Sequence, residues 1–208
     1  MAETSDGANG GLDHDRIIEA TMHLAAVHGW DQLALRDVAR AVGVGLAELY
    51  RAYPSKQAIL RAYAERLDRA ILDAQEPEDI AEPARDRLFE GLMQRFDRMQ
   101  PNREAIRAIL HSYRRDPLLA VGGVCQLRRS MAAMLEAADL SSAGLRGRLR
   151  RDGLCALFLA VLRIWLSDDT SDMSRTMATL DSYLRRLDQP VAIVEGLRTR
   201  GASQEQAI

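Results

Sequence analysis

The stretch LRDVARAVGVGLAELYRAYPSKQAIL, from Leu35 to Leu60, has the spacing of two short helices joined by a tight turn. In a helix-turn-helix, a small residue in the first helix lets the second helix pack close, and a glycine four residues later makes the turn. Ala39 is the small residue here and Gly43 is the glycine. Five apolar side chains fill the angle between the helices: Val38, Val42, Val44, Leu49 and Ala52. The stretch therefore predicts helices at about residues 35–42 and 46–53.

The flanking residues predict a helix on each side of this pair. Asp13 is a suitable N-cap for a first helix that ends near Gly29, and Ser55, after Pro54, caps a fourth helix that reaches about Ala74. The first helix is expected to bury one stripe: Ile17, Ile18, Thr21, Leu24, Ala25 and His28.

The rest of the chain also has helical periodicity, and no stretch alternates as a β-strand does. Further helices are expected near 84–99, 103–113, 118–140, 145–166 and 174–187. The acidic segment from Gln75 to Pro83 holds two prolines and marks a domain boundary. We therefore predict an all-α protein with a disordered lead-in at 1–11, a three-helix helix-turn-helix domain with a connecting helix at 12–74, a helical ligand-binding and dimerisation domain at 84–188, and a tail at 189–208.

Composition excludes several classes of protein. The chain has 208 residues, 47% of them hydrophobic, and its formal net charge is −2, so binding to nucleic acid requires a local patch. Cys125 and Cys155 form no redox or metal motif, which favours a reducing cytoplasm. The longest apolar run, Gly153 to Leu166, is too short to span a bilayer. The four histidines lack ligand spacing, and no catalytic motif is present, so we predict neither a metal, a cofactor nor an enzyme.

The stretch from Leu35 to Leu60 resembles the DNA-binding region of the tetracycline-repressor (TetR) family of bacterial transcriptional regulators. The resemblance covers Asp13 to Leu72, and beyond it VLRIWLSDD and TMATLDSYLRRLD are similar to the last two helices of such regulators. In that family a dimer binds operator DNA, the last two helices form the dimer interface, and a ligand in the C-terminal domain changes the separation of the two reading heads. The resemblance implies a ligand-responsive repressor whose partners are double-stranded DNA, a small effector and a second copy of the chain.

The resemblance also implies a role for Lys56, the chain's single lysine. The family's tyrosine, its aromatic residue three further on and its Pro-Ser-Lys correspond to Tyr50, Tyr53 and residues 54–56, so Tyr50 and Lys56 are expected to hold phosphates. Physically, a lysine at a helix N-terminus opposes the helix dipole, and an anionic partner relieves that conflict. For Tyr53 we expect packing under the third helix.

In the major groove, the third helix is expected to expose five side chains: Leu46, Ala47, Glu48, Tyr50 and Arg51. Arg51 is predicted to contact a base, Arg36 is predicted to contact a phosphate, and Gly45 caps the helix. Ala34, Gly45 and Ala52 stand where the family often has hydroxyl or imidazole contacts to phosphate. From Leu12 to Leu72 there are eight basic and eight acidic residues, so this domain has no net charge.

These losses keep an alternative open, in which the fold has lost DNA binding and holds a lipid or an isoprenoid quinone in its C-terminal cavity. Five aromatic residues are expected to surround an apolar effector, with ordinary core packing as the other interpretation: Phe89, Phe96, Tyr113, Phe158 and Trp165.

Two features of the last helices bear on partners. The segment from Gly153 to Leu166 is apolar nearly all round and predicts a dimer, together with a stripe on the next helix made of Met177, Leu180, Leu184 and Leu187. The arginine-rich run from Leu145 to Gly153 is interpreted as a solvated face, with an anionic ligand or partner as the alternative.

Overall fold

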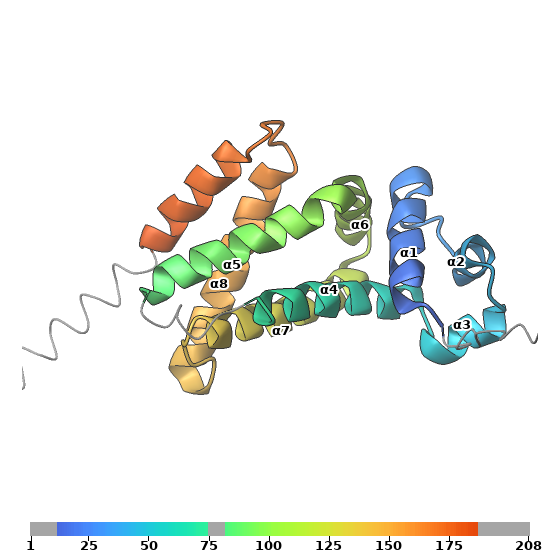
Figure 1. Cartoon of the computed structure of the whole chain (residues 1–208), viewed down its shortest axis with the longest axis horizontal. Helices are drawn as coiled ribbons and strands as arrows, with labels where there is room; N and C mark the ends of the chain where they lie inside the picture. The colour runs from blue at the N-terminus through green and yellow to red at the C-terminus, as the bar shows by residue number, and fades with distance from the viewer. Residues whose placement is uncertain (1–11, 75–81, 187–208) are drawn as a thin grey trace, which may run out of the picture. The chain divides into compact units, whose positions relative to one another are not determined.

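The computed structural model describes residues 12–74 and 82–186, and these residues form helices without a β-strand (Figure 1). The all-α prediction is confirmed. The expected lead-in at 1–11, most of the boundary at 75–83 and the tail at 189–208 lie outside the described residues.

Contacts between residues divide the chain into two compact units. Unit 1 joins the residues up to Tyr63 with Glu104–Arg115, and unit 2 joins Ala64–Arg103 with the residues from Asp116 onward. This division falls inside a helix, after Tyr63, and it groups residues 104–115 with the N-terminal helices. The domain boundaries at 12–74 and 84–188 stay a prediction.

Unit 1 contains the helices α1 (His14–His28), α2 (Leu35–Val42), α3 (Leu46–Ala52), the first part of α4 (Lys56–Leu72) and nearly all of α6 (Arg103–Arg115). The predicted caps are present. The Asp13 carboxylate accepts from the backbone N–H of Arg16 at 3.0 Å, and the Ser55 hydroxyl accepts from the N–H of Ala58 at 3.2 Å. Each side chain satisfies a backbone donor that the first turn of a helix leaves without a partner.

The turn between α2 and α3 has the predicted geometry. Gly43 adopts the left-handed conformation, with φ 74° and ψ 28°, and the N–H of Val44 donates back to the Ala39 carbonyl at 3.0 Å. Ala39 is buried, as the motif requires, and Leu49 is fully buried. Ala52 was expected in this core but is exposed, because α3 ends there and the following Tyr53 is the side chain that turns inward.

The buried face of α1 differs in part from the predicted stripe. Met22 is buried, whereas Leu24 is half-buried and His28 is exposed. The buried positions run along residues 17, 21 and 25 and their neighbours 18 and 22, so the buried arc is rotated from the predicted one towards Met22. His28 ends the helix just before Gly29, where the chain turns away.

Unit 2 contains the rest of α4, α5 (Ala84–Met99), the short 3₁₀ helix η2 (Gln100–Asn102), α7 (Pro117–Ala137), α8 (Gly144–Trp165) and a helix over residues 174–186. Its core is centred on Phe96, which stacks on Phe158 with 5.1 Å between ring centroids and contacts Trp165 at 5.8 Å. All three rings are at most 4% exposed.

A buried ion pair joins α4 to this core. Arg95 of α5 is 4% exposed, and its guanidinium donates to the Asp68 carboxylate. Ser130 of α7 completes the triangle, because its hydroxyl donates to Asp68 at 2.7 Å and accepts from Arg95 at 3.3 Å. Buried charges are tolerated where they are paired and hydrogen-bonded in this way.

The loop before the helix at 174–186 is organised by one buried carboxylate. Asp168 is fully buried and accepts hydrogen bonds from the backbone and hydroxyl groups of Thr170 and Thr176. Burial acts to raise the pKa of Asp168, but these four hydrogen bonds outweigh it and hold the pKa well below its usual range. The carboxylate is therefore charged at neutral pH and fixes the start of the last described helix.

Candidate nucleic-acid interface

One side of α3 is buried in unit 1, and its other side is exposed to solvent. Leu49 is fully buried, whereas Leu46 is 49% exposed and Tyr50 is 58% exposed. Ala47 and Arg51 are exposed as well. A helix of seven residues with a single buried anchor leaves most of its surface available to a partner.

A shallow, open hollow brings the start of α2 next to this exposed side. It is lined by Ala34, Leu35, Arg36, Leu46, Ala47, Tyr50 and Arg51. Five of the eight predicted DNA-contacting residues therefore meet at one surface of unit 1. Of the other three, Gly45 is exposed at the start of α3, Glu48 is half-buried on the same helix, and Lys56 follows at the start of α4.

The two arginines of the hollow keep most of their donors available. The Arg36 side chain is 74% exposed and has the Asp37 carboxylate 4.0 Å away. The Nε of Arg51 donates to the Ala47 carbonyl at 3.3 Å, which orients the side chain along α3. Guanidinium groups held in this way can contact a phosphate or the edge of a guanine.

Lys56 has a role inside the fold that its sequence context did not reveal. Its ammonium donates to the backbone carbonyls of Trp30 at 2.6 Å and Leu33 at 3.0 Å, with a longer contact to Asp31 at 3.5 Å. The ammonium also lies 5.2 Å from the centre of the Trp30 ring. Burial lowers the pKa of Lys56, and the Asp31 carboxylate opposes this change. The phosphate contact of Lys56 stays a prediction, while the geometry shows that it orders the turn between α1 and α2.

The same turn is attached to α6. The Ser112 hydroxyl, on the buried face of α6, donates to the Asp31 carboxylate. Tyr53 is buried, as predicted, and its hydroxyl forms a hydrogen bond with the His14 ring at 2.7 Å. Polar contacts of Lys56, Ser112 and Tyr53 therefore stabilise unit 1 in addition to its apolar core.

The charge of unit 1 is more favourable to a polyanion than the sequence count suggested. Residues 12–63 contain six basic and six acidic residues, and residues 104–115 of α6 add three arginines against Glu104. Unit 1 therefore carries a net charge of +2 within its described residues. This is a modest electrostatic contribution, so any specificity must come from particular contacts.

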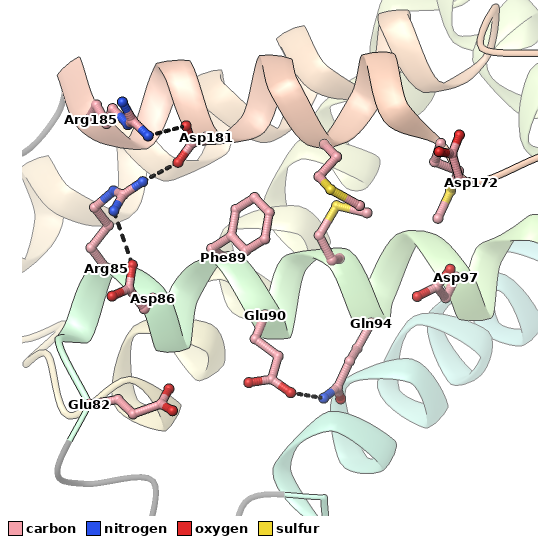
Figure 2. Close-up of a pocket in the computed structure, with 13 residues that line it drawn as sticks. Glu82, Arg85, Asp86, Phe89, Glu90, Gln94, Asp97, Asp172, Asp181 and Arg185 are labelled. Carbon is pink, nitrogen blue, oxygen red and sulfur yellow. Dashed lines mark hydrogen bonds and ion pairs between the residues drawn. The ribbon is translucent and has the colours of Figure 1, made fainter. Parts of the chain in front are cut away.

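The five aromatic residues predicted to surround an effector are divided between the two units, and their role in binding one stays a prediction. Phe96, Phe158 and Trp165 pack against each other in the core of unit 2, and Tyr113 belongs to unit 1. Burial raises the pKa of Tyr113 above its ordinary value. Phe89 alone of the five lines an open groove, shown in Figure 2. Core packing therefore accounts for the three rings of unit 2 that are fully buried.

The groove in Figure 2 runs between α5 and the helix at 174–186 and has a volume of about 750 Å³. Phe89, Met93 and Met177 give it an apolar floor. Carboxylates predominate among its polar side chains: Glu82, Asp86, Glu90, Asp97, Asp172 and Asp181.

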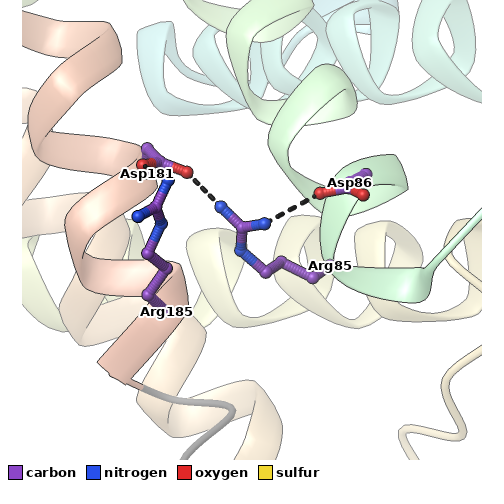
Figure 3. Close-up of polar contacts among 4 residues, drawn as sticks. All are labelled: Arg85, Asp86, Asp181 and Arg185. Atoms are coloured by element: carbon purple, nitrogen blue, oxygen red, sulfur yellow. Dashed lines mark hydrogen bonds and ion pairs between the residues drawn. The ribbon is translucent and has the colours of Figure 1, made fainter.

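Ion pairs cross one end of this groove (Figure 3). Arg85 donates to Asp86 at 3.0 Å and to Asp181 of the last helix, and Arg185 donates to the other oxygen of Asp181 at 2.9 Å. Two arginines and two carboxylates balance each other there, so the cluster links α5 to the last described helix without net charge.

The described part of the chain has neither a membrane-spanning helix nor a metal-binding cluster. None of its helices has the length and hydropathy needed to cross a membrane. Residues 12–74 and 82–186 also contain no group of three or more histidine, cysteine, aspartate or glutamate side chains placed to hold a metal ion.

Unit 1 has the geometry of a helix-turn-helix, and this part of the chain is similar to known proteins. Residues 17–63 match the model of the bacterial regulatory proteins of the tetR family. The HTH-type transcriptional regulator AlkX of Mycobacterium tuberculosis is 32% identical over 66 residues, which is 32% of this chain and 31% of AlkX. The chain thus matches about a third of the length of this curated relative.

Solved structures extend the likeness in fold to most of the chain. A TetR transcriptional regulator from Nitrosomonas europaea has a TM-score of 0.69 at 21% identity, covering 83% of this chain and 96% of that one. FadR of Thermus thermophilus, a TetR-family repressor solved in complex with lauroyl-CoA, has a TM-score of 0.55 at 19% identity, with 83% and 91% covered. Residues 17–63 are thus similar to the tetR family of bacterial regulatory proteins, and most of the chain shares its fold with a solved TetR regulator.

Proposed function

We propose that this protein is a transcriptional repressor that binds operator DNA as a homodimer and responds to a small molecule. The observation that carries the proposal is the hollow where Arg36, Tyr50 and Arg51 meet on the exposed side of α3. Arg51 contacts a base edge, since it lies on the helix that would enter the major groove. Arg36 and Tyr50 contact phosphates and position the helix. Lys56 supports this surface by ordering the turn behind it.

A stripe on α8 supports the homodimer. Six exposed positions recur at spacings of four and three residues along the helix: Leu145, Leu149, Asp152, Ala156, Leu159 and Arg163. Leu145 and Leu149 are 75% and 67% exposed, and Met177 on the next helix is 42% exposed. This seven-residue pattern is the one that packs a helix against a partner helix, and a two-fold dimer places the same stripe on both sides.

Two observations support a response to a small molecule. The fold is shared with FadR, whose solved structure holds lauroyl-CoA. The buried Asp68–Arg95 pair attaches α4 to the core of unit 2, and α4 begins beside the helix-turn-helix in unit 1. A ligand that changes the packing of unit 2 therefore has a continuous helix through which to act on DNA binding.

The experiment is a fluorescence-anisotropy titration of the full chain with DNA that flanks its own gene. Arg51→Ala is expected to cost roughly 1–3 kcal/mol and to relax the preference at one base pair. Arg36→Ala should weaken binding to all sequences alike and flatten the logarithmic salt dependence by about one unit per half of the dimer. Arg129 is an exposed arginine of α7, so Arg129→Ala is the matched control. It should change neither the affinity for DNA nor its salt dependence.

Absence of saturable binding at low salt would reject the regulator. The alternative, a protein of this fold that has lost DNA binding and holds a lipid or an isoprenoid quinone, would then take first place. Ala34 and Gly45 favour that outcome, because at these two N-cap positions the chain has no side-chain hydroxyl that could cap the helix or reach a phosphate.

A further inference from the structure

A second hollow in unit 2 is lined mainly by leucine. It is a partly open pocket of about 270 Å³ between α5, α7 and the turn after it, α8 and the helix at 174–186. It shares Arg85 with the groove of Figure 2 and none of that groove's other lining residues. Six leucines form its wall: Leu88, Leu135, Leu140, Leu149, Leu154 and Leu184.

The polar part of this pocket is cationic. Arg85 and Arg150 are the charged residues that line it. The charge of Arg85 is compensated, because its guanidinium is paired with Asp86 and Asp181 (Figure 3). Its Nε is buried and has no hydrogen-bond partner in the described chain. The compensated Arg85 contributes its apolar stem to the wall, so the free charge of the pocket must come from elsewhere.

Arg150 provides that free charge. It is half-buried, and no hydrogen bond or ion pair to it exists within residues 12–74 and 82–186. Arg146 lies one turn earlier on the same side of α8, and the first turn of that helix has no acidic residue. The nearby Asp152 is engaged by Arg128 and Arg151. Within the described residues, no carboxylate therefore pairs with Arg150 at this pocket.

The leucine wall and the unpaired guanidinium at its edge favour two different parts of one ligand. Hydrocarbon binds favourably against the leucines, because it is removed from water there. An anion binds favourably at the guanidinium, because it accepts charge-assisted hydrogen bonds. We propose that this pocket binds a single-chain amphiphile with an anionic head, of the medium-chain carboxylate class, with its chain among the leucines and its carboxylate on Arg150.

The size of the pocket limits the chain. Its volume of about 270 Å³ is just below the range of about 300–1,000 Å³ typical of ligand pockets. One short aliphatic chain fits, and a branched or two-chain lipid does not. Affinity should rise about fourfold with each added methylene until the pocket is full, and then stop rising.

The test is calorimetric titration of the full chain with octanoate below its micelle concentration, beside 1-octanol and octylammonium at the same chain length. Octanoate is expected to bind, octanol to bind at least about tenfold more weakly, and octylammonium not to bind. Equal affinity for the three probes would overturn the role of Arg150. Saturation by anionic phospholipid vesicles but not by octanoate would show a membrane surface to be the partner and would also overturn the proposal.

Two variants and one control locate the site. Arg150→Gln should lose about tenfold in octanoate affinity, whereas Arg148→Gln, exposed on the same helix and absent from the lining, should lose nothing. Ala84→Phe places a ring at the half-buried edge of the pocket and should abolish binding without lowering the melting temperature. Methyl NMR should show octanoate shifting Leu88 and Leu154 and not Leu33 or Leu49 of unit 1. Shifts confined to other leucines would place the ligand elsewhere and reject the pocket.

These titrations contain no DNA, so their outcome is independent of the proposed repressor. A regulatory effect of the ligand does rest on that function. It is measured separately, as a change in operator affinity on adding octanoate to the wild type and to Arg150→Gln. Binding without that change would leave the pocket assigned and would remove octanoate as an effector.

Discussion

Lys56 shows how a single residue can have a role that its neighbours in sequence do not indicate. Its ammonium satisfies carbonyls at Trp30 and Leu33, more than twenty residues earlier in the chain. A carbonyl left without a donor away from water destabilises the fold. The phosphate contact of Lys56 stays a prediction, and the structural role of this lysine was missed, because backbone carbonyls leave no mark in a sequence pattern.

Lys56→Met is expected to lower the free energy of unfolding by about 1–3 kcal/mol, because it leaves these carbonyls unpaired while keeping the apolar stem. Arg61→Met, an exposed residue of the same helix, is the control and should change stability little. Urea titration followed by circular dichroism measures both. A lysine that served only to contact phosphate would give the two variants equal stability.

Asp168 is a second residue whose effect can be measured. Asp168→Asn keeps the shape but removes the charge from the four hydrogen bonds of Thr170 and Thr176, and it should cost about 1.5–3 kcal/mol at neutral pH.

The pH dependence of this effect has a definite sign. The pKa of Asp168 is depressed in the folded state, so its contribution is complete above the ordinary aspartate pKa and is lost as the pH falls through the folded value. Thermal melts from pH 7 down to pH 2 should show the wild type and Asp168→Asn converging on the acid side. A constant difference across that range would contradict the assignment.

The elements were predicted well wherever a cap or a breaker residue defines their ends. The bounds of α2 and α5 agree with the prediction at both ends, because Gly43 stops the first and Pro83 precedes the second. What sequence could not predict was which face meets which partner. Phe96, Phe158 and Trp165 have the same spacing whether they line a cavity or pack on each other, and only the packing of α5 against α8 distinguishes the two.

Substitution of the two glycines of the turn is expected to change stability in opposite directions. Gly43 has φ 74°, so Gly43→Ala is expected to destabilise unit 1 by about 1 kcal/mol through backbone strain, although no atom lies within 4 Å of the added Cβ. Gly45 is the N-cap of α3 with φ −67°, and the nearest atom to an added Cβ is 4.0 Å away. Gly45→Ser should therefore stabilise by a few tenths of a kcal/mol, because it supplies a capping hydroxyl.

Denaturant titration of the two variants compares them directly, and stabilisation by both would contradict the left-handed turn at Gly43. The same Gly45→Ser variant has a second use. If α3 binds DNA, the new hydroxyl also returns a phosphate contact and should raise operator affinity.

At the scale of the molecule, the stripe on α8 predicts association. Leu159 lies near the end of that stripe and is 38% exposed. Leu159→Arg places a charge in the proposed interface, where a two-fold axis would bring two copies of it together, and should convert dimer to monomer at micromolar concentration. Val27→Arg, at an exposed position of α1, is the control and should leave the mass of the associated species unchanged. Analytical ultracentrifugation measures both, and a monomeric wild type would reject the dimer.

The scarcity of lysine makes the helix-turn-helix unusually easy to observe by chemical labelling. Apart from the chain's α-amino group, Lys56 is the one primary amine in the sequence, and its nitrogen is engaged by carbonyls in the folded state. An amine acylating reagent should therefore modify position 56 slowly, at a rate set by opening of the turn between α1 and α2. Mass spectrometry of one peptide would then report the dynamics of the helix-turn-helix in the intact protein.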